Sequence, residues 1–380
     1  MNEAVEKIEI HRGLKGVYFD RSRVCYIDGR AGELRYRGYS IHDLAERSTF
    51  EETCYLLLKG ELPGRGQLDA FTAELKAARA LPEPVYGLIE TIKTAHPMDV
   101  LRTVVSALSA FDPETADKSA GATLRKGMRL TAQVPMIVAA HEHIRNGRAP
   151  VAPDPKLGHA ANFLYMLKGR APSADAARLM DIDMVLHAEH GSNASSFAAR
   201  VVAGTDADLH GAITAAVAAL AGPAHGGAAE NVMRMAQKIG DASKAAEYVK
   251  TKRAKGEPVM GFGHRVYRAE DPRARHMRAG VEKLSREMGE PQWYQILETV
   301  VTAMKPYARH GVNVNVDFYA GVVYFLNGIA EDLFVPIFAV GRVPGWTVQV
   351  LEQLENNILL RPLTLYNGPE PRDYVPIDKR

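Results

Sequence analysis

The spacing of apolar residues predicts a protein built mainly from amphipathic helices. In three segments, apolar side chains recur at steps of three and four residues. Because an α-helix turns once every 3.6 residues, each set lies on one face that can pack against a core. The sets are Leu101, Val104, Val105 and Leu108; Met277, Val281, Leu284 and Met288; and Val348, Leu351, Leu354 and Ile358.

Glycine and proline mark the predicted helix ends. Gly222–Pro223 ends the alanine-rich segment that starts at Gly211, because glycine accepts a left-handed cap and proline cannot continue a helix. Asp271–Pro272 begins a later helix, with Asp271 as its expected N-cap. His141–His143 is interpreted as a solvated helix end, since the two imidazoles, two positions apart, point in different directions.

Strand signals are few. Segments 17–27 and 32–39 carry aromatic and β-branched residues on either side of Asp28–Gly29, which predicts one small N-terminal β-hairpin. A period-2 alternation at 312–316 is too short to anchor a sheet. Strands and helices do not alternate regularly, so a doubly wound nucleotide-binding fold is disfavoured. The predicted fold class is all-α.

Length and composition narrow the function classes. A chain of 380 residues favours two domains over one. A formal net charge of +2 provides no global field for nucleic acid or an anionic membrane. The apolar stretch 212–221 is well short of the roughly 20 residues of a membrane span. With only Cys25 and Cys54 and no signal peptide, we expect a reducing cytoplasm.

The turn Gly222–Gly227 places His225 directly before a predicted helix. Three glycines in six residues let a ligand approach the backbone closely. The positive end of the following helix disfavours a protonated imidazole, so we expect a neutral His225 near pH 7 that can donate one hydrogen bond. Taken alone, the turn is also compatible with a histidine that merely connects two helices.

A second turn, Met260–Arg268, carries His264 just after Gly261 and Gly263. Its glycine spacing is not the phosphate-binding G-x-G-x-x-G pattern. Further along, Arg273 falls in the first turn of the next predicted helix. A cation is unfavourable at that end of a helix dipole, and a bound anion would remove the conflict. The pattern therefore favours an anion-binding role for Arg273.

Asp317 follows the short valine and asparagine alternation. Its simplest role is an N-cap, but the adjacent Phe318 could desolvate the carboxylate and raise its basicity. Two later arginines lie next to glycine or proline: Arg342, which we expect in a turn ahead of a long helix, and Arg361 before Pro362. Rigid turns favour bidentate recognition of a carboxylate.

His187 and His190 lie one helical turn apart, so a metal site has to be considered. The segment matches neither H-E-x-x-H nor H-x-x-E-H. We predict no metal.

Taken together, these motifs resemble the citrate synthase family, and most closely its compact homodimeric bacterial and archaeal type. The set is far more specific than any single motif, because its members follow in order over nearly the whole chain. One departure is Ala228–Ala229, where many relatives carry Ala-Asn. The matching segments are Leu34–Tyr39, His96–Asp99, Ala188–Asn193, Gly222–Gly227, Gly261–Tyr267, Asp271–Arg273, Asp317 and Arg361–Pro362.

The resemblance implies an all-α protein in which a smaller, mobile helical domain is inserted into a large helical domain. Mapped on this chain, residues 1–222 and 333–380 would form the large domain, and residues 223–332 the small one. It also implies a homodimer in which Arg361 crosses the interface to the partner's site.

The implied enzyme is an acyltransferase that joins acetyl-CoA to oxaloacetate and hydrolyses the product to citrate and free coenzyme A. The coenzyme A thioester is a substrate, so no cofactor is expected. The implied catalytic residues are Asp317 as base, His225 on the thioester oxygen and His264 on the ketone. The implied binding residues are His190, Arg273, Arg342 and Arg361 for oxaloacetate, and Gly261, Phe262, Gly263, Arg265 and Arg268 for coenzyme A.

Three alternatives remain open at this point. A 2-methylcitrate synthase would use propionyl-CoA on the same scaffold, and one methylene is worth only about 1 to 3 kcal/mol of discrimination. A metal-dependent hydrolase would use His225, His264 and Asp317 as ligands. An inert helical binding protein would use none of them chemically.

Overall fold

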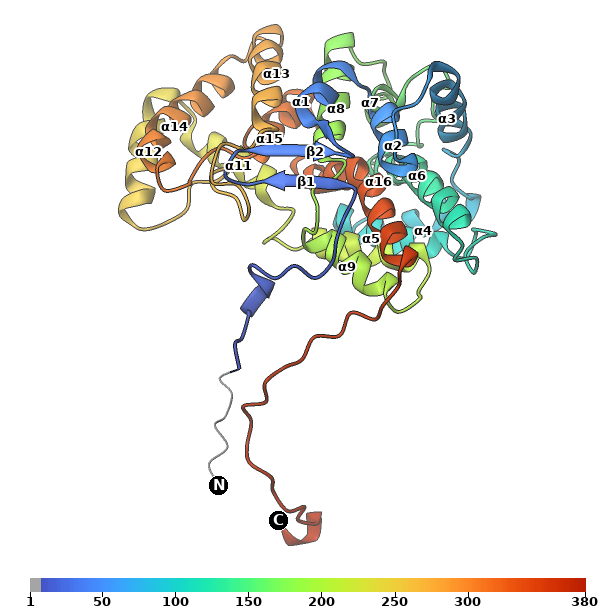
Figure 1. The fold of residues 1–380 in the computed structure, drawn as a ribbon. Coiled ribbons are helices and arrows are strands. Elements are labelled where there is room, and N and C mark those ends of the chain that lie inside the picture. Colours follow the sequence, from blue (N-terminus) through green and yellow to red (C-terminus); the bar gives the residue numbers. More distant parts are fainter. Residues whose placement is uncertain (1–7) are drawn as a thin grey trace.

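The computed structural model describes residues 8–380, and its three strands form a small antiparallel sheet near the N-terminal end (Figure 1). Its strands are β1 (Cys25–Asp28), β2 (Glu33–Tyr36) and β3 (Tyr39–Ser40), in the order β1-β2-β3. The register pairs Cys25 with Tyr36 and Asp28 with Glu33. The predicted hairpin is therefore confirmed, although its strands are shorter than the segments that the sequence suggested, and a third short strand was not predicted.

Helices make up the rest of the body, which confirms the all-α prediction. About 59% of the structure is helical. One group precedes residue 221 and is completed by the last long helix. It consists of η1 (Arg12–Leu14), α1 (Ile41–Arg47), α2 (Phe50–Lys59), α3 (Arg65–Ala77), α4 (Glu83–Thr91), α5 (Pro97–Leu108), α6 (Ala120–Arg145), α7 (His159–Lys168), α8 (Ala174–His187), α9 (Ala194–Ala203), α10 (Leu209–Leu220) and α16 (Phe334–Glu355).

A second group of helices gathers at one side of the molecule in Figure 1. It consists of α11 (Ala228–Ile239), α12 (Ala242–Ala254), α13 (Ala274–Glu287), α14 (Gln292–Ala308) and α15 (Asp317–Leu326). The short helices η2 (Glu331–Leu333) and η3 (Ile377–Lys379) complete the described elements. All five long helices of this group fall within the predicted small domain, residues 223–332, whose boundaries stay a prediction.

The central helix is α16, which packs against α6, α8, α9 and α10. Arg342 and Pro344 lie inside it, so the prediction that Arg342 sits in a turn ahead of a helix is wrong. Glycine is needed here for packing rather than for a turn. A Cβ on Gly345 would lie 2.1 Å from the carbonyl oxygen of Ala188, so only glycine lets the end of α8 come this close.

The segment Glu331–Glu355 is long and apolar enough, by length and composition, to cross a membrane. Apolar runs in the sequence do not predict this segment, because charged residues and prolines interrupt them. Within the protein, 94% of its most apolar window is buried, so the surrounding helices already cover this surface.

Histidines near the end of α6 are buried, which corrects the interpretation of His141–His143 as a solvated helix end. Nε2 of His141 lies 3.0 Å from the carbonyl oxygen of Lys93. Nε2 of His143 lies 2.9 Å from the carbonyl oxygen of Met166. Backbone carbonyls of neighbouring segments thus bind one nitrogen of each imidazole in the core, whereas Nδ1 of His141 is buried without a hydrogen-bond partner among residues 8–380.

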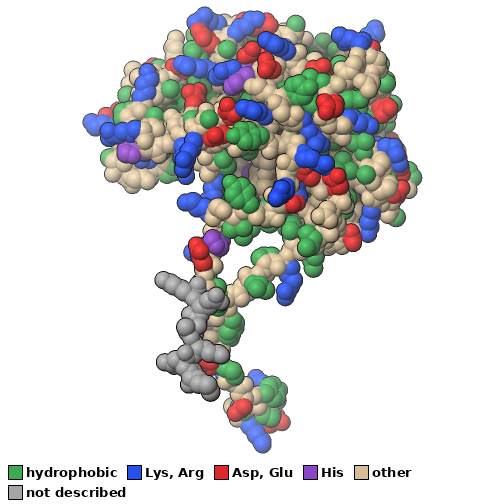
Figure 2. Space-filling view, in the orientation of Figure 1, with side chains coloured by type: hydrophobic (Ala, Val, Ile, Leu, Met, Phe, Trp, Pro, Cys, Tyr) green, Lys and Arg blue, Asp and Glu red, His purple; other side chains and the backbone are tan. Residues whose placement is uncertain are grey.

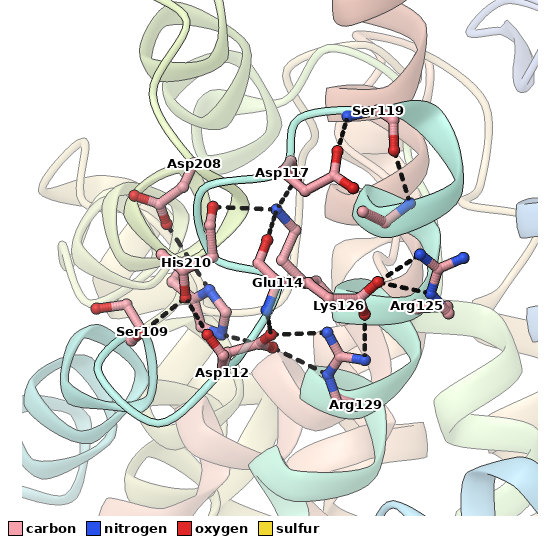
Figure 3. Close-up of polar contacts among 12 residues, drawn as sticks. Ser109, Asp112, Glu114, Asp117, Ser119, Arg125, Lys126, Arg129, Asp208 and His210 are labelled. Atoms are coloured by element: carbon pink, nitrogen blue, oxygen red, sulfur yellow. Dashed lines mark hydrogen bonds and ion pairs between the residues drawn. The ribbon is translucent and has the colours of Figure 1, made fainter.

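Buried charges hold the turn between α5 and α6 (Figure 3). Lys126 is fully buried, and its ammonium donates to the carbonyl oxygens of Glu114 at 3.0 Å and Thr115 at 3.3 Å, and to a third carbonyl of the same turn. Arg129 forms a bidentate pair with Asp112, at 2.9 and 2.8 Å. Cations of α6 therefore anchor this turn.

Residues 356–380 leave the body as an extended tail (Figure 1). Ile358, the last member of the predicted periodic set, lies three positions beyond the end of α16 at Glu355 and is 68% exposed, so it does not belong to the helix. Figure 2 shows positive and negative side chains interspersed over one face of the body, and hydrophobic side chains along the tail. The tail's exposed apolar residues are Ile358, Leu359, Leu363, Leu365, Tyr366, Tyr374, Val375 and Ile377.

Candidate active site

His225 lies in the turn between α10 and α11, as predicted. Its Nε2 is 2.9 Å from Oγ of Ser195, at the start of α9. The pKa of His225 is lowered to about 4, mainly by burial and then by the charge of Arg342. The imidazole is therefore neutral near pH 7, as expected, but burial accounts for this and not the helix end that the sequence suggested.

Ser195 was missed by the sequence analysis. Besides His225, its fully buried side chain contacts Trp346 of α16 and Asn193, the N-cap of α9. The indole of Trp346 donates to Oγ of Ser195 at 3.0 Å, and Oγ lies 2.7 Å from Oδ1 of Asn193. Only the meeting of α9, α16 and the His225 turn makes this serine part of the site.

His264 lies in a loop that is tied to the segment before α15. Its Nδ1 accepts the backbone N–H groups of Val266 at 3.0 Å and Tyr267 at 3.2 Å. The N–H of Gly263 donates to the carbonyl oxygen of Asn313 at 2.8 Å. Burial, followed by the charge of Arg273, lowers the pKa of His264 to about 4, so this imidazole is neutral as well.

His190 follows α8 and is 7% exposed. Its Nε2 lies 3.1 Å from the hydroxyl oxygen of Tyr267, and its ring centroid is 5.2 Å from that of His264. Burial, and then the charge of Arg273, lower the pKa of His190 well below its ordinary value. The two histidines assigned to oxaloacetate thus come together, although 74 residues of sequence separate them.

Arg273 is the N-cap residue of α13, so the prediction that Asp271 caps this helix is wrong. The Asp271 carboxylate accepts hydrogen bonds from the backbone N–H of Arg273 at 3.1 Å and from its Nε and Nη2 at 2.9 and 2.8 Å. Burial alone would lower the pKa of Arg273, but the pair with Asp271 outweighs burial and raises it. A resident carboxylate therefore balances the cation at the helix start, and a bound anion is not needed for that.

Arg342 is 1% exposed, and its Nε donates to the carbonyl oxygen of His187. Its guanidinium carbon lies 4.6 Å from the ring centroid of Phe338. Burial lowers the pKa of Arg342 to about 10, against the opposing effect of the buried Glu189. The guanidinium is thus charged at pH 7 and held on two sides.

Asp317 is the first residue of α15, and Val316 is the N-cap, so the N-cap interpretation of Asp317 is wrong. Its side chain is half-buried. Burial raises its pKa, while the charges of His187 and Arg273 oppose the rise. The adjacent Phe318 is fully buried and packs edge-on against Phe262, with ring centroids 5.0 Å apart. A half-buried carboxylate of raised basicity can act as a proton acceptor.

Six of the seven residues predicted for catalysis and oxaloacetate binding are electrostatically coupled through Arg273 or Arg342. Arg342 shifts the pKa values of His225 and His190, and Arg273 shifts those of His264, His190 and Asp317. The seventh, Arg361, lies on the exposed tail of this single chain.

The residues predicted for coenzyme A lie along the His264 loop. Gly261 is buried, Gly263 is half-buried, and the side chains of Arg265 and Arg268 are exposed. Phe262 helps to line a cavity of about 270 Å³ that contains none of the three predicted catalytic side chains. No group of three or more His, Cys, Asp or Glu side chains within residues 8–380 is arranged to hold a metal ion.

Comparisons with known proteins identify the family of this chain. The family model described as "Citrate synthase, C-terminal domain" matches residues 13–363. A citrate synthase of Haloferax volcanii is 44% identical over 98% of this chain and 99% of its own. A 2-methylcitrate synthase 1 of Corynebacterium glutamicum is 41% identical over 98% of this chain and 99% of its own.

Among solved structures, citrate synthase from Pyrobaculum aerophilum matches with a TM-score of 0.93 and 38% identity, covering 98% of this chain and 95% of its own. Citrate synthase from Thermoplasma acidophilum, solved as a ternary complex with carboxymethyl coenzyme A and oxaloacetate, matches with a TM-score of 0.92 and 30% identity, covering 98% of this chain and 100% of its own. The family match and these full-length similarities establish that the chain belongs to the citrate synthase family.

Proposed function

We propose that this protein condenses acetyl-CoA with oxaloacetate and hydrolyses the resulting thioester to citrate and free coenzyme A. One observation carries the proposal: two neutral imidazoles, two buried arginines and a half-buried carboxylate of raised pKa converge from separate segments. Together they provide a base, hydrogen-bond donors and a site for a dianion, which is what this condensation requires.

In the first step, Asp317 takes a proton from the acetyl methyl group. Neutral His225 donates its N–H to the thioester oxygen, which gains negative charge as the enolate forms. A donor already in place stabilises that charge without reorganisation, and removing such a donor typically costs about 10² to 10³ in rate. The contact between His225 and Ser195 holds the imidazole in position for this role.

In the second step, the enolate carbon attacks the ketone carbon of oxaloacetate. His264 polarises the ketone oxygen through its free N–H and gives that proton to the new alkoxide. Arg273, Arg342 and His190 hold the two carboxylates of oxaloacetate. Water then attacks the thioester carbonyl and releases citrate and the coenzyme A thiol. Closure of the small domain over bound oxaloacetate would keep water out until the carbon bond has formed.

We assign coenzyme A binding to the His264 loop. The backbone from Gly261 to Gly263 would lie along the adenine, and the exposed side chains of Arg265 and Arg268 are free to reach phosphates. Coenzyme A enters as part of the substrate, so the proposal includes no cofactor.

The proposed assembly is a homodimer in which Arg361 completes the oxaloacetate site of the partner. The exposed apolar residues of the tail support this, because a second copy would cover surface that one chain leaves open. Mixing inactive Asp317→Asn and Arg361→Ala subunits tests it. Hybrid dimers would contain one intact site, so activity should return to about a quarter of the wild-type level. No recovery in hybrids that form would refute the crossing.

We retain the cytoplasm as the proposed location. Both cysteines are free thiols, which fits a reducing compartment.

Release of free thiol on mixing the protein with oxaloacetate and an acyl-CoA tests the central proposal. Acetyl-CoA and propionyl-CoA are compared side by side, because the relatives include a 2-methylcitrate synthase at nearly the same identity as the citrate synthases. We expect the higher kcat/KM with acetyl-CoA. No thiol with either substrate would refute the proposal, and a reversed ratio would identify a 2-methylcitrate synthase.

A further inference from the structure

We propose that Tyr267 is a positioning residue for this condensation: its hydroxyl places the proton of His190 on Nδ1, and its backbone N–H helps to place the proton of His264 on Nε2. The inference rests on the proposed function and concerns the same oxaloacetate site. Tyr267 follows His264 by three residues and is 1% exposed.

The contacts of His264 decide which of its nitrogens carries the proton. Nδ1 accepts the backbone N–H groups of Val266 at 3.0 Å and Tyr267 at 3.2 Å. A neutral imidazole has one N–H, and a nitrogen that accepts hydrogen bonds cannot carry it. The proton therefore lies on Nε2, which leaves an N–H donor for the ketone oxygen of the substrate.

The hydroxyl of Tyr267 decides the same question for His190. It lies 3.1 Å from Nε2 of His190, its one recorded hydrogen-bond partner among residues 8–380. A buried O–H group needs an acceptor, and if Nε2–H donated to the hydroxyl oxygen, the phenol hydrogen would have none. The phenol therefore donates to Nε2, and the proton of His190 lies on Nδ1, the nitrogen left for a substrate carboxylate.

Ring packing keeps these hydrogen bonds in place. The ring centroid of Tyr267 lies 4.8 Å from that of His264 and 5.5 Å from that of His190, and the two imidazoles are 5.2 Å apart. The N–H of Arg268 donates to the carbonyl oxygen of Gly29 at 2.7 Å, which fixes the backbone just after Tyr267. One residue thus orients both histidines.

Tyr267 does not supply a proton itself. Burial raises its pKa further above the ordinary tyrosine value, against the opposing effect of Arg273, so the phenol stays protonated throughout the reaction. Its contribution is orientation, which affects binding of oxaloacetate more than the encounter with acetyl-CoA.

Tyr267→Phe tests the hydroxyl, with Tyr319→Phe as the matched control. Tyr319 is equally buried, and its hydroxyl lies 3.0 Å from the carboxylate of Glu298, outside the proposed machinery. We expect kcat/KM for oxaloacetate to fall by about 10- to 100-fold in Tyr267→Phe, with KM for acetyl-CoA within about twofold of wild type. Tyr319→Phe should match wild type. Identical kinetics in the two variants would overturn the proposal.

A second pair of variants reads the position of the proton on His190. An asparagine amide nitrogen falls near the place of Nδ1, and a glutamine amide nitrogen falls near that of Nε2. His190→Asn should therefore bind oxaloacetate about tenfold or more tightly than His190→Gln. Equal affinities, or the reverse order, would overturn the assignment even if Tyr267→Phe failed to fold.

The two proposals fail in different ways. Wild-type protein that releases no thiol from either acyl-CoA refutes the proposed function. If the wild-type protein is active, a Tyr267→Phe variant that matches Tyr319→Phe refutes only the positioning role. Equal oxaloacetate affinities of His190→Asn and His190→Gln do the same.

Discussion

Replacing Gly29 by alanine should damage the active site from outside it. Gly29 lies in the β1–β2 turn, and a Cβ on it would be 2.3 Å from the carbonyl oxygen of Val266. An ordinary contact between carbon and oxygen is about 3.3 Å or longer, so turn and loop must separate by about 1 Å. The backbone of Gly29 has no positive φ, so alanine is tolerated there except for this collision.

The displaced segment is the one that orients His264. Val266 donates its backbone N–H to Nδ1 of His264, and the carbonyl oxygen of Gly29 accepts the N–H of Arg268. A misplacement of about 1 Å in a reacting group can cost about 10²-fold in rate. We therefore expect kcat/KM for oxaloacetate to fall by about 10- to 100-fold, which corresponds to about 1.4 to 2.7 kcal/mol of lost transition-state stabilisation.

Steady-state kinetics with oxaloacetate varied at saturating acetyl-CoA, together with thermal unfolding, measure this effect. Gly66→Ala is the matched control, because Gly66 lies in α3 and nothing approaches its Cβ position within 4 Å. That control should keep wild-type kinetics and gain up to about 1 kcal/mol of stability from helix propensity. Gly29→Ala with kcat/KM within about threefold of wild type would refute the proposed link between hairpin and loop.

Three further outcomes are expected. Asp317→Asn should lower kcat by about 10² or more while oxaloacetate still binds in calorimetry, and a loss below tenfold would contradict its role as base. Burial raises the pKa of Asp317, and a base must be ionised to accept a proton, so activity should fall as the pH falls through that raised carboxylate pKa. If the residual activity of Asp317→Asn fell in the same way at low pH, Asp317 would not be the group that controls this pH dependence. Lys126→Met should lower the free energy of unfolding by about 2 to 4 kcal/mol in urea titrations, because it leaves the carbonyls bound by this buried ammonium without their donor. The exposed Lys118→Met in the same turn should cost less than about 0.5 kcal/mol.

Local rules account for much of what the sequence predicted. The apolar periodicity that located α5 and α13, and the Gly222–Pro223 stop after α10, depend on contacts within a few residues. The resemblance to the family rests on the ordered motifs, because these contain the residues that the chemistry of the site needs. The sequence therefore predicts His225, His264 and Asp317 as catalytic candidates without knowledge of the fold.

Long-range packing decided the rest. Arg342 lies inside α16 because the close approach of α8 stabilises a glycine- and proline-containing stretch as helix, and no local signal contains that approach. Asp271 pairs with Arg273 because both are buried together, which a helix-cap rule does not anticipate.

The sequence by itself determined which elements form and which residue types are available for chemistry. The tertiary structure determined the protonation states and the orienting partners, because these depend on burial and on neighbours far apart in the chain. The fold gives Ser195 and Tyr267 their roles. It places Ser195 beside His225, and Tyr267 between His190 and His264. Desolvation then keeps both catalytic imidazoles neutral and raises the basicity of Asp317, and burial of that kind is a property of the packed molecule alone.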